Sequence, residues 1–147
     1  MKYIILAGDM GIGNWIMLEP IISSLAKSTG FKILVVDFSC QTPLRYVELL
    51  EYIDKVIPIY GNSNEGRLKN KLNRIFKIFS LIKIILKIGR KNLIVYGRHT
   101  YSKRNLILAF LCGGKRSFIN VHADDPYRIF YSIIGCSIRC YDPEMHE

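Results

Sequence analysis

The chain has 147 residues, of which 50% are hydrophobic and 22% are charged. This hydrophobic content excludes a disordered chain, and the length suits one domain with a core of its own better than two. The formal net charge of +9 indicates a positive field that would suit nucleic acid, an anionic membrane or a phosphorylated ligand.

Targeting and metal signals are weak. Asp9 interrupts the first apolar run too early for a secretory signal, and no uncharged run reaches the length of a membrane-spanning helix. We therefore expect a soluble, cytoplasmic chain. The four cysteines lack the paired spacing of a zinc site, so we expect free thiols and no bound metal.

The predicted elements alternate between strands and helices. Aliphatic runs predict strands over residues 2–8, Phe31–Asp37, Lys55–Tyr60, Asn92–Gly97 and Lys115–Val121. Helices are predicted over Trp15–Thr29, Pro43–Glu51, Arg67–Ile88, Lys103–Cys112 and from Asp125 or Pro126 to Ile134. This order predicts an α/β fold, a Rossmann-like doubly wound parallel sheet of about five strands. We expect the domain to span residues 1–136 and residues 137–147 to form a tail without a strand.

The segment from Gly8 to Asn14 joins the first predicted strand to the first predicted helix. Such a glycine-rich turn presents backbone N–H groups and the partial positive charge of a helix N-terminus. This geometry favours an anionic or polyhydroxyl ligand. The alternative is a tight turn whose glycines only provide conformational freedom.

Two nucleotide-binding patterns fit this turn poorly. A P-loop needs a lysine near its end, and the turn has none. A dinucleotide fingerprint that starts at Gly11 and Gly13 would place its third glycine at Ile16. Only Asp37, where a ribose-binding carboxylate would lie, fits that pattern, so a dinucleotide-binding domain is the weaker alternative.

Several motifs follow one another in an order that is known from one enzyme family. They are Gly11–Asn14, Leu18–Leu25 with its early proline, Lys32–Val36, Tyr52–Ile57, Asn92–Gly97, the helix over Ser102–Leu111, and Gly113–Arg116. As an ordered set they resemble the N-terminal half of glycosyltransferase family 9, the lipopolysaccharide heptosyltransferase-like enzymes.

The resemblance implies the N-terminal, acceptor-binding domain of a GT-B glycosyltransferase of cell-envelope biosynthesis. Such an enzyme transfers a sugar from a nucleotide-sugar donor to a lipopolysaccharide or other cell-surface glycan, and needs no further cofactor. A second domain holds most of the donor in this family. Residues 1–147 contain no such domain, so we expect a truncated chain that is inactive by itself.

The resemblance also indicates candidate site residues in the glycine turn. In the family, an aspartate directly after the turn is the candidate base, and that position is Asn14 here. An amide cannot accept the acceptor's proton, so base catalysis by Asn14 is in doubt, and we expect Asn14 to cap the helix. Asp9 is the nearby carboxylate that could replace it. Gly11 and Gly13 are expected to contact the acceptor.

A basic segment follows the fourth predicted strand. We expect Arg98, His99, Lys103 and Arg104 to bind a phosphorylated or carboxylated acceptor, because arginine recognises phosphate at two points. The alternative is a solvated helix start, although positive charge opposes the helix dipole there. The loop His122–Asp125 after the fifth strand has side chains that suit an acid–base role. A capping aspartate and a surface histidine are the preferred interpretation.

The predicted helix Arg67–Ile88 is both amphipathic and basic. Its apolar face lined by lysines is typical of an interfacial membrane helix and also of a crossover helix packed on a sheet. We favour packing, and keep peripheral contact with the inner face of the cell membrane as the alternative. Nucleic-acid binding is not expected, because no recognition motif accompanies the charge. A non-catalytic glycan- or anion-binding module derived from the same fold is the alternative function.

Overall fold

A computed structural model of the chain describes residues 1–8, 11–38, 42–60, 67–97 and 103–141, with residues 67–69 and 141 described by their backbone alone. The strands are β1 (Tyr3–Ala7), β2 (Lys32–Asp37), β3 (Ile53–Pro58), β4 (Leu93–Gly97), β5 (Ser117–His122) and β6 (Ser137–Tyr141). The α-helices are α1 (Ile12–Thr29), α2 (Leu44–Val47), α3 (Arg67–Ile88), α4 (Lys103–Cys112) and α5 (Arg128–Ile133). Short 3-10 turns, η1 (Arg90–Asn92) and η2 (Gly114–Arg116), precede β4 and β5.

The strands form one parallel sheet in the order β3-β2-β1-β4-β5-β6. This is the strand order of the doubly wound, Rossmann-type fold, so the predicted fold class is confirmed. Ile4 in β1 lies beside Ile33 of β2 on one side and Ile94 of β4 on the other. β1 is therefore the central strand at which the direction of the chain across the sheet reverses.

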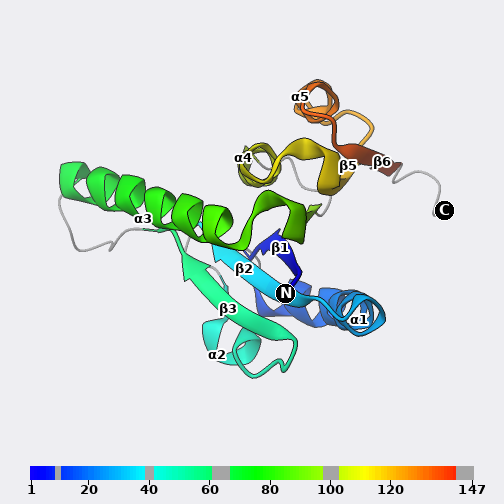
Figure 1. The fold of residues 1–147 in the computed structure, drawn as a ribbon, viewed down its shortest axis with the longest axis horizontal. Helices are drawn as coiled ribbons and strands as arrows, with labels where there is room; N and C mark the ends of the chain where they lie inside the picture. The colour runs from blue at the N-terminus through cyan, green and yellow to red at the C-terminus, as the bar shows by residue number, and fades with distance from the viewer. Residues whose placement is uncertain (9–10, 39–41, 61–66, 98–102, 142–147) are drawn as a thin grey trace.

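Helices cover both faces of the sheet (Figure 1). On one face, α1 and α2 cover a core cluster that includes Trp15, Leu18 and Ile22 together with Ile33 and Val35 of β2. On the other face lie α3, α4 and α5 over a second cluster. Its members include Leu81, Ile85, Leu108 and Tyr131 from the helices and Val95 and Ile119 from the strands.

The ends of α1 show why this segment is a long helix. Trp15, Leu18, Ile22 and Ala26 recur at helical spacing and form its buried face. The helix ends where predicted, at Gly30, which has φ of 67° and donates its N–H to the carbonyl oxygen of Ala26 (2.9 Å). Pro20 lies within this single helix, on an exposed side.

The prediction that residues 137–147 contain no strand is wrong. Ser137–Tyr141 form β6, which pairs with β5 in parallel from Phe118 beside Ser137 to His122 beside Tyr141. β6 lacks the aliphatic run that marks the inner strands because it lies at the edge of the sheet. Among the β6 residues whose side chains the structure describes, Ile138 alone packs against a core cluster. The sheet thus has six strands instead of about five and continues past residue 136.

Candidate anion-binding site at the carboxyl edge of the sheet

The order of the strands marks the ends of β1 and β4 as the place where a ligand crevice is expected in this fold. In a doubly wound sheet, ligands bind beyond the carboxyl ends of the strands where the chain direction reverses, and β1 and β4 are the two strands at that point. β1 is followed by the glycine turn and the first turn of α1, and β4 is followed by the segment that begins α4. The described parts of the two clusters that the sequence suggested separately, residues 11–14 and 103–104, therefore lie at the same edge of the sheet.

Gly8 fixes the path of the chain directly after β1. Its N–H donates to the carbonyl oxygen of Val36 (2.8 Å), which continues the pairing with β2. Its own carbonyl oxygen accepts from Thr42 Oγ1 (2.6 Å) and from Trp15 Nε1 (3.3 Å). The two bonds join the end of β1 to α1, through the fully buried Trp15, and to the segment before α2, through Thr42.

The strands on both sides of the crevice end in glycines that have no room for a side chain. A Cβ atom on Gly8 would clash with Val35 Cγ1 and lie 2.8 Å from Thr42 Oγ1. A Cβ atom on Gly97 would lie 2.6 Å from Ile119 Cδ1. The sequence motifs include both residues but did not indicate their close packing, although a glycine at the end of an aliphatic run is a signal of it.

Gly11 and Gly13 differ from these packed glycines. Both are exposed, and a Cβ atom on either would meet no other atom within 4 Å. Gly11 has φ of −65° and Gly13 lies inside α1, so neither position needs the left-handed conformation that favours glycine. The space beside their backbone is open to a ligand.

The N-cap of α1 is Gly11, so the prediction that Asn14 caps this helix is wrong. The helix starts at Ile12, earlier than predicted, and Asn14 is the third helical residue. The first intrahelical bond runs from Trp15 N to Gly11 O (3.2 Å). Residues 11–14 are exposed and the first turn has no acidic residue, so the helix N-terminus presents its partial positive charge to solvent.

The start of α4 adds fixed positive charge to the same edge. Lys103 is exposed and Arg104 is half-buried, and the first turn of α4 has no acidic residue. Asn105 is buried against Gly97 at the end of β4, which holds this turn close to the sheet. The other candidate residues, Asp9, Arg98 and His99, lie outside the described residues.

A titratable pair lies one strand away from β4. His122 at the end of β5 has its Nδ1 atom 4.0 Å from Asp124 Oδ1, and its side chain is 25% exposed. Asp125 is buried, and its Oδ1 atom accepts the N–H of Tyr127 (2.7 Å) just before α5. This bond forms a turn before α5, whose N-cap is Tyr127 without a side-chain cap bond, so the expectation of a capping aspartate is wrong. His122 is partly exposed.

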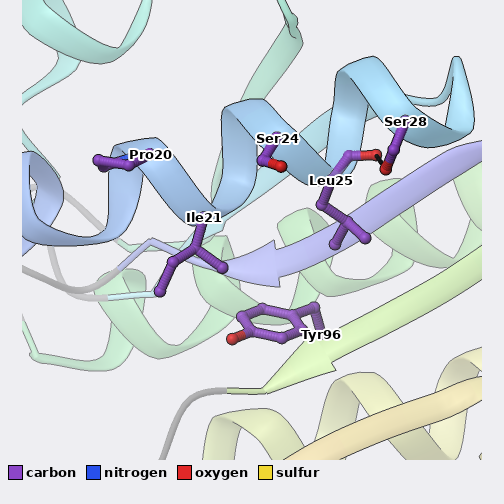
Figure 2. Close-up of a pocket in the computed structure, with 6 residues that line it drawn as sticks. All are labelled: Pro20, Ile21, Ser24, Leu25, Ser28 and Tyr96. Carbon is purple, nitrogen blue, oxygen red and sulfur yellow. Dashed lines mark hydrogen bonds between the residues drawn. The ribbon is translucent and has the colours of Figure 1, made fainter.

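A groove of about 490 Å³ runs along α1 on the side that faces β4 (Figure 2). Ile21 and Leu25 point from the helix toward the ring of Tyr96, and Ser24 and Ser28 line the groove from the same helix. The Tyr96 hydroxyl accepts a hydrogen bond from Asn120 Nδ2 of β5 (3.4 Å). The volume lies within the range of small-molecule sites, and no sequence motif indicated it.

Asp37 gives little support to the dinucleotide alternative. It ends β2, as that alternative requires, but the residue is fully buried. Its carbonyl oxygen accepts the N–H of Ile59 (2.6 Å), which extends the pairing with β3. A ribose-binding carboxylate has to face the ligand, and this one faces the interior.

Comparison of the chain with protein-family models, with curated proteins and with solved structures finds no match in any of the three.

Proposed function

We propose that the chain is the acceptor-binding half of a heptosyltransferase-like glycosyltransferase. The enzyme would transfer a sugar from a nucleotide-sugar donor to a phosphorylated glycan, such as the inner core of a lipopolysaccharide. One observation supports the proposal: the N-terminus of α1 follows β1 and the basic start of α4 follows β4, at the same edge of the sheet. The ordered motifs that resemble family 9 give this anion site its carbohydrate interpretation.

The site has the groups that a phosphorylated acceptor requires. The N–H groups in the first turn of α1 suit one phosphate, because a helix N-terminus combines unpaired donors with a favourable dipole. Lys103 and Arg104 would supply positive charge from the start of α4, and an arginine can bind phosphate through two parallel hydrogen bonds. The ring of Tyr96 at the neighbouring groove offers a flat apolar surface to the acceptor.

Transfer of a sugar also needs a base for the acceptor hydroxyl. Asn14, at the position of the family's aspartate, cannot accept a proton. His122 with its partner Asp124 is the described group at this edge whose chemistry suits the role. The donor's diphosphate would be held by a second domain, as the family resemblance implies.

The substitution at Asn14 also favours a second candidate function, a glycan- or anion-binding module without catalysis. This module would bind the same acceptor at the same crevice and turn over no donor. The two candidates therefore share the binding site and differ only in chemistry.

Binding of the acceptor is tested by calorimetric titration with a phosphorylated core oligosaccharide. Replacing Lys103 and Arg104 by Gln removes two charged donors, so the affinity should fall by about tenfold or more. The matched control replaces Lys91 and Lys115 by Gln, which removes the same charge at the opposite edge of the sheet, in η1 and η2. Equal losses in both double variants, or no binding by the unaltered chain, would contradict the proposal.

Catalysis is tested separately by measuring the release of nucleoside diphosphate from sugar nucleotides. The measurement combines the chain with acceptor and a separately produced donor-binding domain. The enzyme proposal predicts release that requires the chain and falls at least about a hundredfold in His122→Asn, since general base catalysis contributes that much. Acceptor binding without any release would leave the non-catalytic module as the function.

A further inference from the structure

The helix α3 carries two apolar faces, and only one of them belongs to the core. Leu81 and Ile85 are buried in the cluster beneath the helix. A second set of large apolar residues is solvent-exposed, with 48–66% of each residue accessible. We call this set the outer stripe, and it consists of Leu72, Ile75, Phe76, Phe79 and Leu86.

The outer stripe is continuous along one side of the helix. Leu72 lies three and four residues before the adjacent pair Ile75 and Phe76, which lies four and three residues before Phe79. Leu86 follows Phe79 by seven residues, and these spacings place side chains above one another on a helix. The N-terminal half of α3 extends beyond the sheet, away from the body of the molecule (Figure 1). Lys77, in the middle of the helix, contacts a residue after the end of β3: its Nζ atom donates to the carbonyl oxygen of Tyr60 (2.6 Å) and lies 5.3 Å from the Tyr60 ring centroid.

The neighbouring helices also carry exposed apolar residues. α4 and α5 lie on the same face of the sheet as α3 (Figure 1). Phe110 of α4 is 68% exposed, and Ile129 and Ile133 of α5 are 70% and 74% exposed. On this face, exposed apolar residues are therefore present on all three helices instead of lining a single cleft.

The charge on these helices has one sign. The sequences of α3, α4 and α5 contain ten Lys and Arg residues and no Asp or Glu. Lys71, Lys83 and Lys87 are exposed among or beside the residues of the outer stripe. Lysines in such positions can direct their charged ends to lipid headgroups while apolar neighbours enter the acyl boundary.

We propose that the outer stripe, together with the basic residues of α3, docks on the surface of an anionic membrane. An apolar stripe beside lysines, without acidic residues, matches the chemistry of anionic lipid headgroups above hydrocarbon. The spread of the apolar residues over three helices suits a planar partner better than a segment that inserts into a groove. None of the described helices has the combined length and apolarity that crossing a bilayer requires, so the contact is peripheral. The proposal does not depend on the sugar-transfer function.

The test is co-sedimentation of the full chain with phosphatidylcholine vesicles that contain or lack phosphatidylglycerol. The chain should bind the anionic vesicles, and bind them less at high salt. Replacing Phe76 and Phe79 by Ser should reduce the partition coefficient by about tenfold or more, because two large apolar groups no longer enter the lipid. Replacing Lys71, Lys83 and Lys87 by Gln should remove the preference for phosphatidylglycerol.

The matched control replaces Met17 and Phe118 by Ser. These residues are 67% and 51% exposed on α1 and on β5, outside the three helices, and should leave vesicle binding unchanged. Thermal unfolding checks that each variant folds.

As a second measurement, Phe76→Trp keeps the stripe apolar, and its fluorescence should shift to shorter wavelength with anionic vesicles. The proposal would be overturned if the unaltered chain did not bind anionic vesicles, or if the stripe variant, with Phe76 and Phe79 replaced by Ser, bound them equally well. Self-association that the stripe variant abolishes, without vesicle binding, would also overturn it and identify a protein interface.

Discussion

The two longest helices, α1 and α3, contribute to the molecule in different ways. α1 has 18 residues, and its buried residues run from Trp15 near the start to Ala26 near the end. α3 has 22 residues, and its described buried residues, Leu81 and Ile85, both lie in its C-terminal half. The comparison indicates that α1 is fixed along its length and positions the glycine turn. The first half of α3 contributes little to the core, so its apolar residues are available for another contact.

The largest expected effect follows from truncating the buried start of α1. Trp15→Ala removes a fully buried ring and its hydrogen bond to Gly8 O, and should lower the free energy of unfolding by about 3–5 kcal/mol. Phe76→Ala truncates a residue that is 66% exposed, and should change the free energy of unfolding by less than about 0.5 kcal/mol. Urea unfolding measures both values. Similar losses in the two variants would show that α3 is held along its whole length.

A second, smaller contrast lies within the glycine turn. Gly8→Ala introduces a Cβ atom that clashes with Val35, and should destabilise the fold by about 1–3 kcal/mol. Gly13→Ala places its Cβ atom in open space within a helix, and should leave stability unchanged or raise it by up to about 1 kcal/mol. The same urea measurement tests the pair. Destabilisation by Gly13→Ala would mean that the first turn of α1 is packed in solution.

The third prediction concerns the interior beneath α3 and α4. Its effect on the free energy of unfolding is absent at neutral pH and develops at alkaline pH. Burial raises the pKa of the Cys112 thiol from its ordinary value of 9.0 to about 12, although the charge of Arg90 lowers it in part. The folded state thus retains a proton that the unfolded chain loses above pH 9.0. The stabilisation from the protonated thiol is complete below that pH and is lost as the pH rises through about 12.

This alkaline loss is measured by urea unfolding over the range from neutral to strongly alkaline pH. Cys112→Ala should lose less stability than the unaltered chain above pH 9.0, and its pH dependence below that value should be the same. The pKa of Tyr52 is also raised to about 12, mainly by burial, so part of the alkaline loss should persist in the variant. Identical alkaline profiles for the two proteins would mean that the thiol meets solvent.

The fold was predictable because its inner elements have strong sequence patterns. The helix Arg67–Ile88 was predicted with these bounds, since a long amphipathic repeat has few alternatives. β6 was missed because an edge strand needs little apolar character, and three of its residues, Ser137, Arg139 and Cys140, are exposed. Asn14 was assigned as the helix cap from its cap preference, but the helix starts at Ile12, with Gly11 as its N-cap and Gly13 in its first turn.

The site was only partly predictable. Sequence alone suggested the glycine turn and the basic segment, and the strand order brings their described parts to one crevice. The packing of Gly8 against Val35 and Thr42 could not be inferred, because it depends on contacts between segments far apart in the sequence. The groove beside Tyr96 likewise arises from the distance between α1 and β4, which no local pattern specifies.

The most direct test of the central claim is a titration of the ¹⁵N-labelled chain with a phosphorylated core oligosaccharide, followed by NMR. The account predicts that the largest amide shift changes occur at residues 11–14 and 103–105, on the two sides of the crevice between β1 and β4. Shift changes confined to η1 and η2 at the opposite edge of the sheet, or no saturable change, would contradict it.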